Sequence, residues 1–384
     1  MDSSSTQQQQ DKSRILLFSN RNIFDPLVWR CSFQEFEKII QENDDVDVLA
    51  PKPTKWYPKG RRIAARVGEF APIPLNPGIP NITVDRDYDM FFTICERVSE
   101  LLHLQGVKGI KDRCKKSVCF IMEFYIKDIP VYKSCLEVLS QFDHVVFMFV
   151  ANEPFKKYLK GQSSFLPAGI DALKFSPYPN PPARSIDVLN IGRRAPATHQ
   201  ALLRMAKEEG KFYVYDTIDS LRAYSLEEHR GLMANMTKRS RYFIVSPGKF
   251  DKPEETGGLS EFGNRYVEAA APGCIMLGMR PSNNPEFEKI FFWPDAVIDV
   301  PFTNDEIVSV IHELDKDPDR QNRVRRMNMT QCLLHHDWAY RWESLLALAG
   351  LQPRPKLQAR KQALRELAST VEHDFAQREM SGVR

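Results

Sequence analysis

Two carboxylates and an arginine in the second half of the chain have the spacing of a binding site. Glu261 and Glu268 stand seven residues apart, close to two helical turns, so a helix that begins early places both on one face. Arg265 falls on the same face, three residues before Glu268. A carboxylate there can accept hydrogen bonds from a ribose diol, and the amides around Gly263 and Asn264 can meet phosphate oxygens. The pattern predicts a site for a nucleotide that carries phosphate groups.

Two further polar loops follow apolar runs in this half of the chain. A glycine lets the backbone approach a phosphate, arginine can bind it bidentately, and the start of the next helix adds partial positive charge. An isolated Gly-Arg-Arg is also typical of a solvated turn. The segment at 192–194 alone therefore fits either a phosphate site or a solvated turn. The candidate donor ligands in these two loops and in the helix start are Gly192, Arg193, Arg194, His199 and Ser246.

Short apolar runs alternate with stretches of helical period along the whole chain, which is typical of an α/β fold. Because ligands bind outside the carboxyl ends of parallel strands, the candidate residues fall where such a fold places a site. The expected strands of the first half are 14–19, 46–50, 90–95, 118–122 and 144–150, with helices at 33–41 and 131–141. The expected strands of the second half are 186–191, 212–215, 242–245, 274–277 and 296–300, with helices at 199–209, 226–237, 265–271, 305–314 and 319–349.

A proline-rich segment at 176–182 divides the two series, because proline breaks both helix and sheet. A length of 384 residues suits two domains of ordinary size. We therefore expect two Rossmann-like domains that face each other across a cleft. The predicted division is a disordered tail at 1–13, a first domain at 14–175, a linker at 176–183, a second domain at 184–350 and a helical extension at 351–384.

Composition and charge narrow the function classes. A net charge of +3 and a pI of about 8.4 are weak for a dedicated nucleic-acid binder, so we expect no nucleic-acid partner. No apolar run approaches the roughly 20 residues of a membrane span, and the chain starts with polar residues, so a cytoplasmic location is expected. The seven cysteines include no Cys-x-x-Cys pair and are expected to be buried free thiols.

Four segments, in the expected order, resemble signatures of the GT-B glycosyltransferases, particularly the CgeB-like branch. Residues 268–277, Glu-Ala-Ala-Ala-Pro-Gly-Cys-Ile-Met-Leu, resemble the E-A-x-A-x-G-x-P-V motif of the second domain. Residues 191–193, Ile-Gly-Arg, resemble the strand that opens that domain, and residues 165–171 resemble the P-x-G-x-D segment before the linker. Residues 335–341 resemble the closing H-x-W-x-x-R helix. The resemblance hardly reaches 1–150, so it does not identify an acceptor.

The resemblance implies a glycosyltransferase, and more narrowly a hexosyltransferase, that moves a sugar from a nucleoside diphosphate sugar such as a UDP-sugar. The first domain is then the acceptor domain and the second the donor domain. In this family fixed arginines and amide dipoles stabilise the diphosphate leaving group, so no metal and no cofactor besides the nucleotide-sugar co-substrate is implied. Glu268 is then the acid that binds the ribose. The family places its other acid at Ser260, whereas this chain has Glu261, which reaches the sugar only after a local shift.

Two more positions depart from the family pattern. His199 stands where related enzymes carry a phosphate-binding lysine, and Arg194 can compensate for it. The glycine pair that commonly follows the first strand is replaced by Ser-Asn-Arg-Asn at 19–22, which includes Asn20. An inverting enzyme also needs a general base from the first domain, and whether this chain retains or inverts is open. The catalytic candidates are Glu123, Asp128 and His144 in the first half and Glu261 in the second.

Residues 51–80 have the composition of a long loop, and long loops are often functional. Trp56 and Tyr57 lie among basic residues that include Arg61, so they can stack on an acceptor sugar or hold an acidic one. The alternative is a basic aromatic patch that contacts anionic lipid. The candidate acceptor ligands are Asn20, Trp56, Tyr57 and Arg61, for a carbohydrate or small-molecule acceptor.

Two other functions fit the same architecture. A nucleotide-sugar 2-epimerase shares the diphosphate site of the second domain. A non-catalytic nucleotide-binding scaffold protein is favoured by the missing glycine loop and the displaced glutamate. A Rossmann dehydrogenase is disfavoured because no G-x-G-x-x-G follows 15–18 or 188–191.

Overall fold

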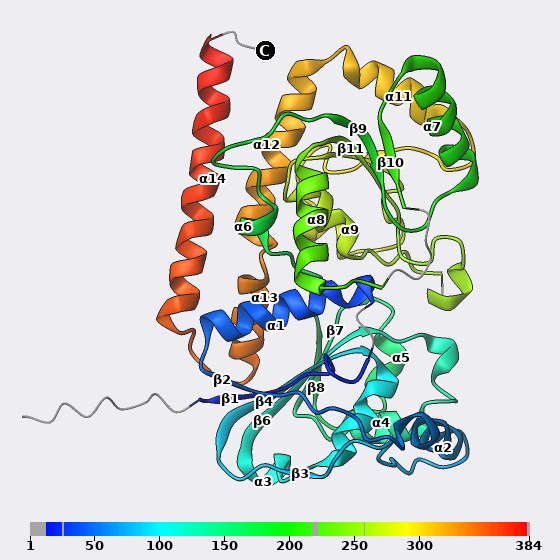
Figure 1. The fold of residues 1–384 in the computed structure, drawn as a ribbon, viewed down its shortest axis with the longest axis vertical. Coiled ribbons are helices and arrows are strands. Elements are labelled where there is room, and N and C mark those ends of the chain that lie inside the picture. Colours follow the sequence, from blue (N-terminus) through cyan, green and yellow to red (C-terminus); the bar gives the residue numbers. More distant parts are fainter. Residues whose placement is uncertain (1–12, 25–26, 217–221, 257, 382–384) are drawn as a thin grey trace, which may run out of the picture.

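The computed structural model describes residues 13–24, 27–216, 222–256 and 258–381, and the predicted tail lies outside them except for Ser13. The chain forms two α/β units, the lower built from the first half of the sequence and the upper from the second half (Figure 1). Each unit contains a parallel sheet with helices packed against it. The expected α/β class is confirmed.

The first sheet has six parallel strands in the order β2-β1-β4-β6-β7-β8. Its central strands are covered on both faces, which is why they appear in the sequence as continuous apolar runs. The strands are β1 (Ile15–Phe18), β2 (Val46–Leu49), β4 (Tyr88–Arg97), β6 (Cys114–Glu123), β7 (His144–Phe147) and β8 (Gln162–Phe165), while β3 (Ile82–Thr83) and β5 (Val107–Lys108) pair separately. The helices are α1 (Cys31–Asn43), α2 (Tyr57–Phe70), α3 (Ile110–Arg113), α4 (Lys133–Leu139), α5 (Glu153–Lys156) and α6 (Ala172–Phe175), with 3-10 helices η1 (Val28–Arg30), η2 (Val98–Gly106) and η3 (Ile126–Asp128).

The second sheet has five parallel strands in the order β10-β9-β11-β12-β13. The expected strands of this half are present, with their ends shifted by a few residues. They are β9 (Ile186–Asn190), β10 (Tyr213–Tyr215), β11 (Ser240–Val245), β12 (Ile275–Gly278) and β13 (Ile298–Asp299). The helices are α7 (Pro196–Glu209), α8 (Leu226–Lys238), α9 (Asn264–Ala270), α10 (Phe287–Ile290), α11 (Glu306–Asp315) and α12 (Pro318–His335), with the 3-10 helix η4 (Pro253–Thr256).

Residues 51–80 do not form the long loop expected from the sequence, because α2 occupies much of this segment. Proline is common in the first turn of a helix, because the amides of that turn have no acceptor within the helix, and α2 has a proline there. The buried side of α2 contains the small residues Gly60, Ala64 and Gly68. A buried face with so few large apolar side chains gives little hydrophobic periodicity, so the sequence pattern concealed this helix.

The helical run expected at 319–349 is two helices, α12 and α13 (Trp338–Leu348). The break falls at Asp337, which adopts an extended backbone conformation. Its side chain accepts a hydrogen bond from the Ala339 amide at 2.8 Å and so caps the start of α13.

Helix α13 returns the chain to the first unit. The ring of Trp338 stacks on Phe36 of α1 with their centroids 4.4 Å apart. Trp342, one turn later, lies 5.4 Å from the ring of Phe92 in β4. All four side chains are fully buried. The core of the first unit is therefore completed by residues from near the end of the chain.

The C-terminal helix α14 (Pro355–Ser381) runs along α12 at the left of Figure 1. The sequence left open whether 351–384 packs or is solvated, and α14 packs through one narrow row of side chains. The buried residues of that row are Leu357, Leu364, Ala368, Val371 and Phe375. Within the described residues, no helix combines the length and the apolar character needed to cross a membrane.

Two segments cross between the units side by side. The Ile170 amide donates to the carbonyl of His336 at 3.0 Å, and the Trp338 amide donates to the carbonyl of Ile170 at 3.0 Å. Gly169 stands against the Trp338 ring, where an added Cβ would lie 2.7 Å from Cε3. The glycine of the P-x-G-x-D segment thus allows the first crossing to lie against the second.

Candidate functional site

A cavity of about 160 Å³ lies between the two units. Its wall in the first unit follows the ends of β6 and β7, and its wall in the second unit follows the end of β11 and the loop before α9. Carboxyl ends of parallel strands form the ligand site of open α/β sheets, so this cavity is the candidate site. Its lining includes Glu123, Tyr125, Phe149, Lys249, Glu255 and Glu261.

Three basic side chains of the second unit come from three separate segments, and one of them, Lys249, lines the cavity. Arg193 follows β9, Lys249 lies in the loop after β11, and Arg265 stands in the first turn of α9. Gly192 has a φ of 99°, and a Cβ added to it would lie 3.8 Å from Nε of Arg265, so the first and third segments meet. The side chains of Arg193, Lys249 and Arg265 are exposed by 42%, 21% and 36%. This arrangement can hold a diphosphate.

The first two of these cations are paired with carboxylates of the second unit. Arg193 pairs with Asp251, and Nζ of Lys249 lies 2.8 Å from Glu255. Glu255 also pairs with Lys127 of the first unit at 2.8 Å, so it bridges the two walls of the cavity. Hydrogen bonds from Lys127 and Lys249 lower the pKa of Glu255 to about 2. Lys249 was not predicted from the sequence, because no spacing motif marks it.

Glu268, expected to bind a ribose, has an exposed fraction of 2% and does not line the cavity. Its two oxygens pair with Arg265 and with Arg230 of α8. Burial alone would raise the pKa of Glu268, but the two guanidiniums outweigh it and lower the pKa to about 2. In this structure Glu268 holds Arg265 beside the cavity, and the ribose contact predicted for it requires one arginine to move.

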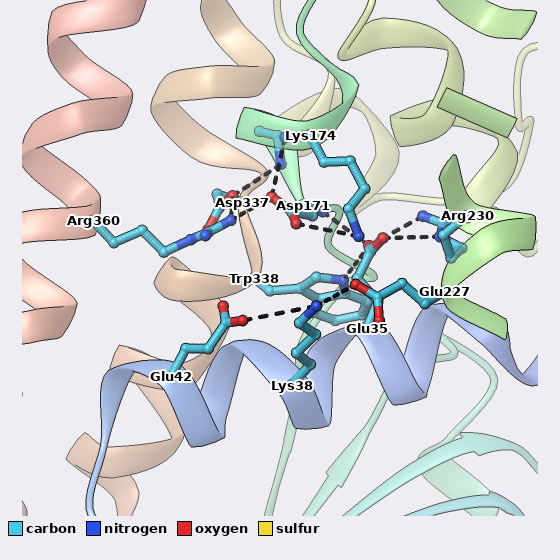
Figure 2. Close-up of polar contacts among 11 residues, drawn as sticks. Glu35, Lys38, Glu42, Asp171, Lys174, Glu227, Arg230, Asp337, Trp338 and Arg360 are labelled. Atoms are coloured by element: carbon cyan, nitrogen blue, oxygen red, sulfur yellow. Dashed lines mark hydrogen bonds and ion pairs between the residues drawn. The ribbon is translucent and has the colours of Figure 1, made fainter. Parts of the chain in front are cut away.

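Arg230 extends this pairing into the first unit (Figure 2). Its Nε lies 2.9 Å from Oε2 of Glu35 in α1, and its Nη2 lies 3.1 Å from Oε1. Glu35 also accepts hydrogen bonds from the Asp171 amide at 2.9 Å and from Nε1 of Trp338 at 3.2 Å. One carboxylate therefore joins α1, α8 and both crossing segments. Glu35 and Arg230 are 195 residues apart, so no local sequence pattern indicates this pair.

Glu261 lies in the loop before α9 and not on the helix, because Gly263 is the residue that caps α9. The expected placement of both glutamates on one helical face is therefore wrong. The carboxylate of Glu261 crosses the cavity instead and accepts hydrogen bonds from the amides of Val150 and Ala151, each at 2.9 Å. Burial raises the pKa of Glu261, and the two amides oppose that rise. The residue connects the two units.

Glu123 is the last residue of β6 and lines the cavity, half-buried, from the side of the first unit. Burial raises its pKa, while the charges of Lys249, Arg97 and Arg193 oppose the rise. A carboxylate with a raised pKa that faces cations across a cavity is suited to accept a proton from a hydroxyl group. Asp128, the end of η3, also has a pKa raised by burial, but it does not line the cavity.

His144 starts β7, and in a parallel sheet the starting end of a strand is the edge away from the cavity. It lines an open groove of about 550 Å³ at that edge, and its Nε2 is 3.0 Å from Oγ of Ser164. His144 therefore does not lie at the cavity, and the structure does not support its predicted role as a base there. The apolar run 144–150 did not show which of its ends faces the cleft.

Arg194 and His199 do not line the cavity and contact other residues of the second unit. Nη1 of Arg194 lies 2.6 Å from Asp216, whose carboxylate also accepts the Gly192 amide at 3.1 Å. Nδ1 of His199 lies 2.8 Å from the hydroxyl of Tyr213. Burial and the charge of Arg194 lower the pKa of His199, so the imidazole is neutral at pH 7 and does not replace a lysine charge. Lys249 supplies a cation from a different loop.

The remaining donor candidates surround the start of α9. Gly263 lines the cavity. Nδ2 of Asn264 donates to Oγ of Ser32 in α1 at 2.6 Å, so it connects the units. Ser246 is half-buried directly after β11 and three residues before Lys249.

Two of the four acceptor candidates are internal. Tyr57 is buried, and its hydroxyl lies 3.0 Å from Nε2 of His103, whose Nδ1 lies 2.7 Å from Oδ1 of Asn20. The Tyr57 ring therefore does not stack on a ligand, and Asn20 is committed to this network. Trp56 is exposed by 49%, and Arg61 is exposed as well. None of the four lines the cavity.

The comparison with protein families identifies one segment of the chain. Residues 226–347 match the family described as glycosyl transferase-like. The matched segment extends from the start of α8 into α13 and includes Arg230, Lys249, Arg265 and Glu268. No curated protein matches the sequence.

Solved glycosyltransferases share the fold of most of the chain. An α-glucosyltransferase in complex with UDP and a 13-mer DNA containing an HMU base is 12% identical, with a TM-score of 0.52, and the match covers 88% of this chain and 100% of that chain. An α-glucosyltransferase with UDP-glucose and DNA containing an abasic site is 13% identical, with a TM-score of 0.53 and the same coverage. The chain thus has the GT-B fold, and by this fold and the family of its second domain it is a glycosyltransferase.

Proposed function

We propose that this glycosyltransferase moves a hexose from a nucleoside diphosphate sugar, UDP-hexose in the first place, to a hydroxyl group of a carbohydrate or small-molecule acceptor. The observation that carries the proposal is Lys249 on the wall of the second unit, across the cavity from the carboxylate of Glu123. Arg193 is near enough for its charge to act on Glu123, and Arg265 lies next to Gly192. The α-glucosyltransferases that share the fold are bound to UDP or UDP-glucose, which supports the choice of base.

The cations have a defined role in such a transfer. The bond between the sugar and the diphosphate breaks, and negative charge develops on the leaving β-phosphate. Lys249 and Arg193 now pair with Glu255 and Asp251, and a diphosphate of higher charge would replace these carboxylates. We expect the cations to supply this stabilisation without a metal ion, so that chelators leave turnover unchanged.

Glu123 is our candidate for the general base. Its pKa is raised by burial, and neutralising Lys249 and Arg193 with a bound diphosphate would raise it further. A carboxylate in that state can remove the proton of an acceptor hydroxyl as the hydroxyl attacks the anomeric carbon. The proposal assigns the acceptor to the side of the first unit, where Tyr125 and Phe149 also line the cavity.

Calorimetric titration with UDP tests the donor site. Lys249→Ala is expected to weaken UDP binding about 10- to 100-fold, because a hydrogen bond to a charged group is lost. Lys252→Ala, an exposed lysine in the same loop, is the matched control and is expected to leave binding unchanged. Equal affinity of the Lys249 variant and the wild type would contradict the site.

Turnover tests the chemistry. With a panel of UDP-sugars and acceptors, release of UDP is expected to fall in Glu123→Gln while the affinity for UDP is retained. Conversion of the donor to its epimer without an acceptor, and without hydrolysis, would identify an epimerase. Binding without any turnover would identify a nucleotide-binding scaffold protein. Transfer to DNA and not to sugars or small molecules would contradict the proposed acceptor class.

A further inference from the structure

Helix α2, at the right of the lower unit in Figure 1, carries large apolar side chains on its outer face. Its inner face has Tyr57 and the three small residues described above. Trp56, Ile63 and Phe70 are exposed by 49%, 48% and 79%. A surface helix usually buries its large apolar residues, so this exposed set is unusual.

The three exposed apolar residues form a row. Successive members are seven residues apart, which is almost two helical turns, so Trp56, Ile63 and Phe70 lie on one side of the helix. Ile73, just beyond the helix, is also exposed, by 54%. The row thus runs the full length of α2. The Trp56 ring covers Gly60, where an added Cβ would lie 2.1 Å from Cζ3, and about half of the Trp56 surface stays exposed.

A second row, of basic residues, lies beside the apolar row. Lys59 and Arg66 each follow an apolar member by three residues, and Arg62 stands between them. All three are exposed, and none forms an ion pair with a described residue. Residues 51–84 contain six basic residues and one acid. The outer face is therefore both apolar and strongly positive.

We propose that the outer face of α2 docks on the surface of an anionic lipid bilayer. The apolar row enters the boundary between headgroups and acyl chains, and the basic row contacts lipid phosphates. A helix that lies in the interface plane needs apolar and basic rows along its whole length, which is the pattern seen here. A nucleic acid would use the basic row but would leave the aliphatic side chain of Ile63 in water, so the bilayer fits both rows better.

The proposed surface is connected to the side of the first unit that faces the second. Tyr57 begins α2, and through His103 it is hydrogen bonded to Asn20, just past the end of β1. Docking by α2 would thus hold the molecule close to the carboxyl ends of the first sheet. This inference concerns where the protein works, and it holds whether or not the proposed donor is correct.

Sedimentation with vesicles tests the proposal on the full chain. The protein is expected to bind vesicles of phosphatidylcholine with phosphatidylglycerol, to bind vesicles of phosphatidylcholine alone much less, and to dissociate at high salt. The variant K59Q/R62Q/R66Q is expected to lower the partition coefficient about 100-fold, since it removes three charges. The variant W56S/I63S/F70S is expected to lower it about tenfold or more.

Two matched variants serve as controls. K207Q/K316Q/R323Q removes three exposed charges elsewhere, and F212S/L232S/F292S removes apolar side chains exposed by 56%, 57% and 56%. Both are expected to bind vesicles like the wild type, and circular dichroism checks that every variant is folded. Failure of the wild type to bind anionic vesicles, or equal losses in the controls, would overturn the proposal. Binding of a DNA duplex that the charge variant loses and the apolar variant keeps, with no vesicle binding, would assign the face to nucleic acid.

Discussion

Replacing Arg230 by methionine tests whether the buried charge network joins the two units. Arg230 has an exposed fraction of 3% and pairs with Glu35 in the first unit and Glu268 in the second. Methionine replaces the apolar stem of the arginine side chain and removes the guanidinium. Two carboxylates then stay buried, and Glu268 retains one cation, Arg265.

The expected loss is large. Removing one partner of a buried ion pair costs about 3 to 5 kcal/mol. The lowering of the Glu268 pKa from 4.5 to about 2 corresponds to roughly 3 kcal/mol of stability at neutral pH, a figure of the same order. Because this pKa is lowered in the folded state, the stabilisation is present above pH 4.5 and is lost as the pH falls towards 2.

Urea unfolding at pH 7 and pH 4 measures both parts of this prediction. We expect Arg230→Met to lower the free energy of unfolding by about 3 kcal/mol at pH 7, and by clearly less at pH 4, where carboxylates begin to protonate. Arg239→Met, an exposed arginine at the end of the same helix, is the control and is expected to change it by less than about 0.5 kcal/mol. A loss below 1 kcal/mol at pH 7, or an equal loss at both pH values, would refute the reasoning.

Three other predictions concern buried groups outside this network. Burial raises the pKa of Glu37 to about 7, so stability declines as the pH rises from 4.5 towards 7, and Glu37→Gln is expected to raise the melting temperature at pH 8 by much more than at pH 5. Gly169→Ala is expected to lower the free energy of unfolding in urea by about 1 to 3 kcal/mol, because the added Cβ meets the Trp338 ring. Gly231→Ala in α8, where the Cβ has open space, is the control and is expected to raise it by roughly 0.5 to 1 kcal/mol. Similar effects of the two substitutions would contradict the contact. Glu261→Gln places an amide donor towards two main-chain amides, so we expect the radius of gyration from small-angle scattering to increase, and an unchanged radius would speak against Glu261 as a connection between the units.

The fold was largely readable from the sequence because parallel strands are buried on both faces. Runs such as 15–18 and 242–245 are continuously apolar for that reason, and they appear as β1 and within β11. Helix α2 could not be found in this way, because Ile63 and Phe70 are exposed and Tyr57 is the one large side chain among its buried residues. The break before α13 was also missed, since the signal is a single side-chain cap at Asp337 inside a helix-prone stretch.

Only part of the candidate site could be predicted from the sequence. Arg193, Gly263 and Arg265 were predicted because glycine and arginine directly follow strands or open a helix, which are local signals. Lys249 lines the cavity from a loop in which the lysine itself has a φ of 57°. No local residue pattern predicts this backbone conformation. Glu261 was misplaced because α9 starts only at Asn264, and its contact with the other unit depends on the packing of the whole chain.

The return of α13 to the first unit sets the order in which the protein can fold during synthesis. Residues 13–175 leave the ribosome long before Trp338 and Trp342, so Phe36 and Phe92 lack their packing partners until most of the chain has been made. The second unit can close its own sheet earlier, because all five of its strands lie between 186 and 299. The half that begins the chain is thus the half that finishes folding last, and a stop codon anywhere before α13 would leave it incomplete.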